Sequence, residues 1–167
     1  MRTLASVLNL CLGLAPTLAG AGTLAAPTGP IVLTITGAID NTNADGAAVF
    51  DMAMLDALPG RTARVPTPWY DTDRTFSGPL LSAVLDAVGA HGDALTVTAV
   101  NNYSAELPVT DATEHPVIFA TRIDGKTLSV REKGPLFVIY PFDLDKSLYD
   151  ETHFGRSVWQ VIAADVH

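Results

Sequence analysis

Short alternating segments joined by tight turns are the feature that most limits what this chain can fold into. Segments 31–36 and 95–100 alternate between apolar and other side chains, as half-buried strands do. Asp124-Gly125 is the strongest hairpin signal, and it follows a strand predicted over 117–122. The predicted strands outnumber the helices and are linked mostly by hairpins. The pattern therefore predicts an α+β fold with mixed, mostly antiparallel sheets and a few short helices.

Three short helices are predicted between these strands. Asp51 is placed to cap a helix that runs to Leu58. A clearer helix starts at Ser77-Gly78-Pro79, carries an apolar face at helical spacing and stops at Gly89. Residues 110–114 are predicted to form a single helical turn.

The remaining strands lie in the second half of the chain. Asn101-Asn102 is predicted to turn strand 95–100 into segment 103–108, because Asn tolerates a positive φ. The continuous apolar run 136–140 indicates a central strand, and 157–164 a last alternating strand. We find no internal repeat and no linker after residue 30, so 26–167 is predicted to be one domain.

Residues 1–25 have the layout of a secretory signal peptide. Arg2 precedes an apolar run over 4–24, and small residues follow before the expected cleavage. Ala19-Gly20-Ala21 fits the cleavage rule, and a cut near Ala25 is a second candidate. A membrane anchor is the alternative, since the run approaches the ~20 residues that span a bilayer. Its Gly and Ala content favours cleavage, which predicts a periplasmic protein.

The chain has a single cysteine, Cys11, which lies in the predicted signal peptide. The exported domain is therefore expected to contain no disulfide and no thiolate metal site. Among the 167 residues, 18 are Asp or Glu and 10 are Lys or Arg, giving a formal charge of −8. This balance argues against nucleic-acid binding and against direct binding to an anionic membrane.

Familiar catalytic motifs are absent from the sequence. It has no phosphate loop, no nucleophile elbow and no zinc-binding helix motif. Residue types alone leave a Ser-His-Asp enzyme open, but no local sequence supports one. The histidines are scattered and are not expected to form a zinc site: His91, His115, His153 and His167. The acidic cluster lacks the spacing of a calcium loop and is interpreted as a solvated loop: Asp143, Asp145, Asp150 and Glu151.

Aromatic and polar residues gather instead in loops and at strand ends. Trp69 follows two prolines in a rigid loop, where its ring is as well placed for a ligand as for the core. Arg131 lies in a charged loop before an apolar strand, where its planar fork could pair with an anionic or amide-bearing ligand. Trp159 is predicted to belong to the core rather than to a site. The candidate ligand-binding residues are Trp69, Asn101, Asn102, Tyr103, Glu106, Arg131 and Arg156, with no catalytic or metal-ligating residue.

Several stretches, in this order, resemble the molybdopterin-binding domain of the sulfite-oxidase family of oxidoreductases. They are residues 76–85, 103–108, 119–129, 134–141 and 156–160. The resemblance extends over about 31–166, and it implies the fold of that domain with a pterin-shaped cleft between loops. In that family a cysteine binds molybdenum, but Val65 or a close neighbour stands at that place here. Phe137 likewise replaces an arginine of the family.

The chain is more similar to small exported proteins of this fold that lack the cysteine. Some of these resemble pterin-binding regulators, which bind a reduced pterin without metal and act with a membrane-bound cyclic-di-GMP enzyme. This resemblance implies that a pterin stacks on Trp69 or Tyr103. Asn101, Asn102 or Glu106 would match its polar edge, and Arg131 its carbonyl or tail. Two alternatives stay open: a molybdopterin-dependent oxidoreductase with an atypical metal site, and a ligand-free interaction module.

Overall fold

The computed structural model describes residues 24–167 of the chain. The predicted signal peptide, with Cys11 and the cleavage site Ala19-Gly20-Ala21, lies outside the described residues except for its last two positions. In the described part, none of the helices has the length and apolar character needed to cross a membrane.

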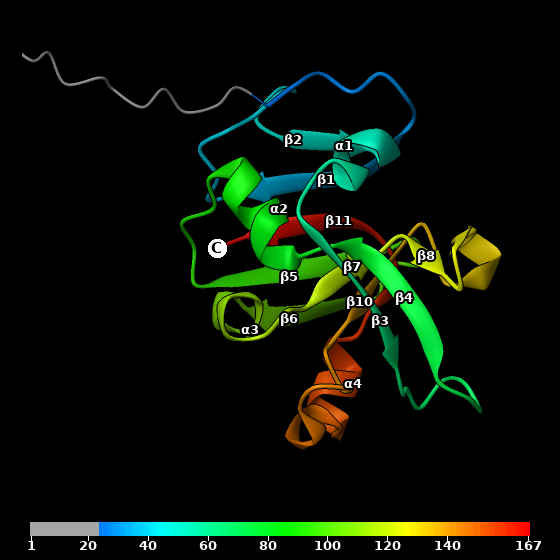
Figure 1. Ribbon diagram of the computed structural model, residues 1–167. Helices are drawn as coiled ribbons and strands as arrows, with labels where there is room; N and C mark the ends of the chain where they lie inside the picture. Colours follow the sequence, from blue (N-terminus) through cyan, green and yellow to red (C-terminus); the bar gives the residue numbers. More distant parts are fainter. Residues whose placement is uncertain (1–23) are drawn as a thin grey trace, which may run out of the picture.

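The larger of two sheets is built around the last strand of the chain (Figure 1). Within residues 24–167 its seven strands are β1 (Ile31–Gly37), β2 (Ala48–Asp51), β5 (Ala94–Ala99), β6 (Ser104–Pro108), β7 (Ile118–Ala120), β10 (Leu136–Ile139) and β11 (Trp159–Val166). Strand β11 pairs in parallel with β1 and antiparallel with both β5 and β10. The first and last thirds of the domain therefore meet at its centre.

The smaller sheet extends away from the larger one as a long hairpin (Figure 1). Its members in the described chain are β3 (Gly60–Val65), β4 (Arg74–Pro79), β8 (Arg122–Ile123) and β9 (Lys126–Thr127). The predicted strand 117–122 is divided between the sheets, because the backbone passes from β7 to β8 at Thr121. At this crossing Thr121 N donates to Ser77 O over 2.9 Å, which ties the two sheets together.

The helices are short, as the sequence predicts. They are α1 (Met52–Asp56), α2 (Leu81–Val88), α3 (Val109–Glu114) and α4 (Glu151–Arg156), with 3-10 turns η1 (Val130–Glu132) and η2 (Lys146–Leu148). Asp51 caps α1 by accepting from Met54 N, and Gly89 ends α2 in the left-handed conformation with a φ of 61°. Helix α2 lies over one face of the larger sheet (Figure 1).

The prediction that Ser77-Gly78-Pro79 starts a helix is wrong. These residues form the end of β4, and α2 begins two positions after Pro79. Gly78 is required there by packing, since a Cβ at this position would collide with the backbone oxygen of Phe119 in β7. The same small residue that suggests a helix boundary thus allows two strands to approach closely.

One hydrophobic core fills the space between the sheets and helices. Its largest fully buried side chains are Phe50, Phe76, Phe119, Phe137, Tyr140 and Phe142. The α+β class and the mostly antiparallel sheets are as predicted; among the described strands, β1 and β11 form the parallel pair.

Candidate ligand-binding site

An aromatic cavity of about 310 Å³ opens where β5, β11 and α4 approach the loop after β3. We call it the aromatic cavity; it is lined by Trp69, Ala99, Asn101, Tyr103, Phe154, Gly155, Ser157, Val158 and Trp159. Its volume lies at the lower end of the range for small-molecule sites, on the order of 300–1,000 Å³.

Two tryptophans form walls of this cavity that stand nearly at right angles. The ring centroids of Trp69 and Trp159 are 6.1 Å apart, and their planes cross at 77°. A flat ligand that stacks on one of these rings therefore presents its edge to the other. The chain contains no further tryptophan, so both tryptophans of the protein lie in this one site.

Trp69, in the loop after β3, is held by aromatic packing against β10 and α4. Its ring lies against Phe137, with centroids 5.2 Å apart, and against Phe154 of α4 at 6.0 Å. Phe137 is fully buried and also packs edge to face on Trp159. Phe137, which stands where the resemblance implies an arginine, thus supports both walls of the cavity.

Polar atoms at the cavity come mainly from backbone and neutral side chains. Asn101 Oδ1 accepts from Tyr103 N, which leaves the amide NH₂ of Asn101 for a ligand. The Tyr103 hydroxyl donates to Gly155 O over 3.3 Å. Ser157 Oγ donates to His153 O in α4. The cavity therefore offers hydrogen bonds to a neutral polar edge but no charged side chain.

The prediction that Trp159 belongs to the core is wrong, since the residue is 38 % exposed and lines the cavity. Strict alternation from the buried Val161 would bury it as well. The intervening Gln160 has a φ of 58°, which breaks the alternation at the start of β11 and turns Trp159 outward. Sequence alternation alone carries no sign of this break.

Of the seven predicted ligand-binding residues, the structure brings Trp69, Asn101 and Tyr103 together at the aromatic cavity. Asn102 is exposed in the adjoining turn with a φ of 64°, and it does not line the cavity. Glu106 lies on β6 near the chain's end, with a carboxylate oxygen 3.9 Å from His167 Nε2. Arg131 lines a separate, basic cavity. These positions give Asn102 and Glu106 no contact with the aromatic cavity.

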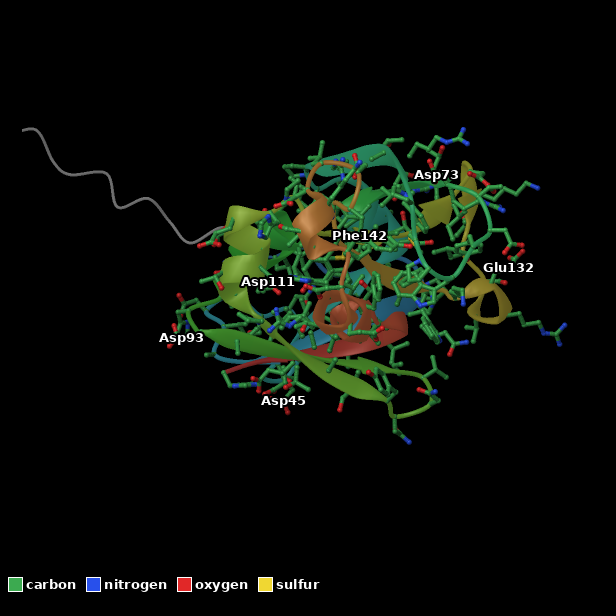
Figure 2. All side chains as sticks on the ribbon, turned by 90° about the horizontal axis from the view of Figure 1, so that it is seen from below. Asp45, Asp73, Asp93, Asp111, Glu132 and Phe142 are labelled. Atoms are coloured by element: carbon green, nitrogen blue, oxygen red, sulfur yellow. The ribbon has the colours of Figure 1, made fainter. Side chains whose placement is uncertain are left out.

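Arg156 does not line the aromatic cavity; it forms an ion pair that connects two helices. Its guanidinium donates to Asp111 Oδ2 over 2.9 Å, and the Tyr140 hydroxyl donates to the same oxygen over 2.6 Å. Burial, followed by the hydrogen bond to Asp111, raises the pKa of Tyr140 well above its ordinary value. The Asp111 carboxylate thereby joins α3 to α4 and to the residue that follows β10; Asp111 is labelled in Figure 2.

The sequence matches a known protein family. The model of the oxidoreductase molybdopterin binding domain matches residues 60–143, half of the chain. The chain belongs to this family. The match runs from β3 to just after β10, so it includes Trp69 and Phe137 of the molybdopterin binding domain but not Trp159.

A solved structure shows the same fold at low sequence identity. The sulfane dehydrogenase SoxCD from Paracoccus pantotrophus superposes with a TM-score of 0.61 at 17 % identity. The superposition covers 81 % of this chain but only 37 % of the SoxCD chain, so this molybdopterin binding domain corresponds to about a third of that chain. No curated protein matches the sequence significantly.

The residues of this molybdopterin binding domain do not fit a thiolate-bound molybdenum. Val65, where the resemblance places the metal-binding cysteine, is fully buried at the end of β3. The aromatic cavity is lined by no thiol, imidazole or carboxylate, and residues 24–167 contain no group of three such side chains arranged to hold a metal. The flat aromatic walls and neutral polar atoms fit the pterin ring of the cofactor, but the lining offers its metal no thiolate, imidazole or carboxylate.

Proposed function

We propose that this protein binds a reduced pterin without a metal and acts as an exported, non-catalytic sensor. The observation that carries the proposal is the aromatic cavity, where Trp69 and Trp159 provide flat faces and the lining contains no thiol, imidazole or carboxylate. Stacking on an indole ring and a few oriented hydrogen bonds are sufficient to bind a small bicyclic ligand.

The polar groups of the cavity would orient such a ligand. The free amide NH₂ of Asn101 is a donor for a ring carbonyl or ring nitrogen, and the Gly155 carbonyl and Tyr103 hydroxyl supply acceptors. A pterin edge carries both amide and amino groups, so it matches this mixture of donors and acceptors. The neutral lining suits an uncharged ring.

The partner in this proposal is the periplasmic domain of a membrane signalling protein such as a cyclic-di-GMP enzyme. Support comes from the resemblance to small exported pterin-binding regulators and from the predicted signal peptide. Crosslinking in cells, followed by recovery of the tagged protein, tests this part. We expect one membrane protein to be crosslinked. The amount crosslinked should change when Trp69→Ala prevents the ligand from binding in the aromatic cavity.

A molybdopterin-dependent oxidoreductase is the second candidate, and membership of the family favours it. In that case a group other than a cysteine side chain would complete the metal site. The two candidates differ in metal content. Molybdenum bound in a one-to-one ratio with the purified protein supports the enzyme and contradicts the metal-free sensor.

Calorimetric titration with tetrahydrobiopterin under nitrogen tests pterin binding directly. We expect saturable binding to one site, accompanied by quenching of tryptophan fluorescence because both tryptophans line the cavity. Trp69→Ala should abolish most of the binding, whereas Trp69→Phe should keep a flat ring and most of the affinity. Equal binding by the unchanged protein and Trp69→Ala would contradict the proposed site.

A further inference from the structure

A second cavity, of about 390 Å³, lies beside the aromatic cavity and has the opposite character. We call it the basic cavity; its charged lining residues are Arg74, Asp124, Lys126, Arg131, Glu132 and Lys133. These side chains carry two more positive than negative charges, in a chain whose formal charge is −8. Figure 2 shows Glu132, which marks this region, on the side of the molecule opposite Asp93.

The cations of this cavity are less neutralised than those elsewhere in the described chain. Arg61, Arg64, Arg122 and Arg156, which lie outside the cavity, each pair with an aspartate. Among residues 24–167, the cations without a carboxylate at ion-pair distance are Lys126, Arg131, Lys133 and Lys146. All but Lys146 line the basic cavity. Unpaired cations converging on a concave surface attract anions.

Arg74 adds a rigid donor to the cavity wall. Its guanidinium pairs with Asp124 over 2.6 Å and lies over the Tyr70 ring at 5.2 Å from the centroid. Its Nε is buried and has no hydrogen-bond partner within the part of the chain that the structure describes. A buried donor without an acceptor is unusual in a folded protein.

Lys133 connects the two cavities. Its Nζ lies 4.3 Å from the ring centroid of Trp159 in the aromatic cavity, and 5.9 Å from that of Tyr70 in the basic cavity. The loop is held in place at Gln160, whose N–H donates to Lys133 O and whose side chain donates to Val130 O. A group that occupies the basic cavity therefore lies within reach of a ligand stacked on Trp159.

We propose that the basic cavity is an anion-binding site that takes a phosphate or carboxylate group. This group is either part of the tail of the ligand in the aromatic cavity or a separate small anion. The first of these two alternatives rests on the proposed function. Lys126, Arg131 and Lys133 supply the charge. Because Lys126 and Arg131 are exposed and Lys133 is only half-buried, the interaction weakens as added salt screens it.

Three probes distinguish the sources: tetrahydrobiopterin with a neutral tail, tetrahydrofolate with a tail of two carboxylates, and inorganic phosphate alone. Binding is measured by calorimetry at low and high NaCl and by tryptophan fluorescence. We expect Lys126→Gln and Arg131→Gln each to lower the affinity for the anionic probe by about threefold to fivefold, as for exposed charge pairs. Neither substitution should change the affinity for tetrahydrobiopterin. Lys146→Gln removes an equally unpaired lysine outside the cavity and should change nothing.

Each outcome decides the proposal. Tighter binding of tetrahydrofolate than of tetrahydrobiopterin, sensitive to salt and to Lys126→Gln, assigns the anion to the ligand tail. Phosphate binding with the same sensitivities assigns it to a separate anion, and it supports the basic cavity even if no pterin binds and the proposed function fails. The proposed anion site is contradicted if no anionic probe binds, or if neither Lys126→Gln nor Arg131→Gln changes the affinity for the probe. The proposed pterin site is unaffected by either result.

Discussion

Phe137 lies under the ring of Trp69, with centroids 5.2 Å apart, and no part of Phe137 reaches solvent. A core residue of β10 thus fixes the wall of the aromatic cavity, and stability and binding are coupled at this pair. Phe137→Ala should lower the free energy of unfolding by about 3–5 kcal/mol, as deletion of a buried aromatic ring does. Phe137→Leu, which retains most of the volume, should cost less. Urea denaturation followed by circular dichroism measures both, and equal losses would contradict the packing role.

Trp159 should contribute to binding without contributing much to the core. The residue is 38 % exposed, and its ring forms the wall that meets Trp69 edge to face. Trp159→Ala is expected to weaken tetrahydrobiopterin about tenfold, the equivalent of a ring contact worth ~1.4 kcal/mol. Trp159→Phe should retain most of the affinity. Calorimetry measures the affinities, and a Trp159→Ala protein that is fully folded yet binds normally would show that the ligand does not use this wall.

The carboxylate of Asp111 should matter more for folding than the guanidinium of Arg156. Asp111→Ala leaves the hydroxyl of the buried Tyr140 without its acceptor, which costs about 1–3 kcal/mol. Arg156→Gln removes a partly exposed partner and should cost less. Because Tyr140→Phe removes the hydroxyl itself, Asp111→Ala should have a smaller effect in that background. Urea denaturation of the unchanged protein, Asp111→Ala, Tyr140→Phe and the double variant forms a double-mutant cycle. Additive losses of unfolding free energy would contradict the coupling.

Asp51 should make the stability sensitive to acid. Hydrogen bonds from the N–H groups of Met54, Gly29 and Thr28 lower its pKa from 3.8 to about 2. Since the folded pKa lies below the unfolded one, its contribution is fully present above pH ~4 and is lost as the pH falls toward 2. Asp51→Asn should flatten the pH dependence of the urea midpoint between pH 5 and 2.

The matched control for this prediction is Asp45→Asn. Asp45 is an exposed residue of the loop before β2, and Figure 2 labels it at the surface. In the described chain it accepts no hydrogen bond from a backbone N–H. Its midpoint should follow that of the unchanged protein at every pH. An Asp51→Asn protein with the same acid profile as Asp45→Asn would disprove the role assigned to the cap.

The sequence predicts elements that depend on neighbours along the chain. Gly89 at the end of α2, the turn at Asn102 and the Asp124-Gly125 hairpin are local signals, and all are present in the structure. It does not predict the passage of the backbone between sheets at Thr121 or the parallel pairing of β1 with β11, because long-range packing decides both.

The same distinction applies to the site. Trp69, Asn101 and Tyr103 were recognisable as loop and turn residues whose side chains are available to a ligand. Trp159 was missed because one positive φ at Gln160 reverses the side that its ring faces. The cations of the basic cavity come from β4, β9 and the loop around η1, and only tertiary structure brings Arg74 beside Lys126 and Lys133. Arg131 alone gave a sign of this second cavity.

The most direct test of a metal-free pterin site is to purify the protein from its native cells under nitrogen and analyse what it carries. Mass spectrometry identifies the small molecule, and elemental analysis counts the molybdenum. The account predicts a reduced pterin without a dithiolene, close to one per chain, and no molybdenum. Molybdopterin with stoichiometric molybdenum would contradict it.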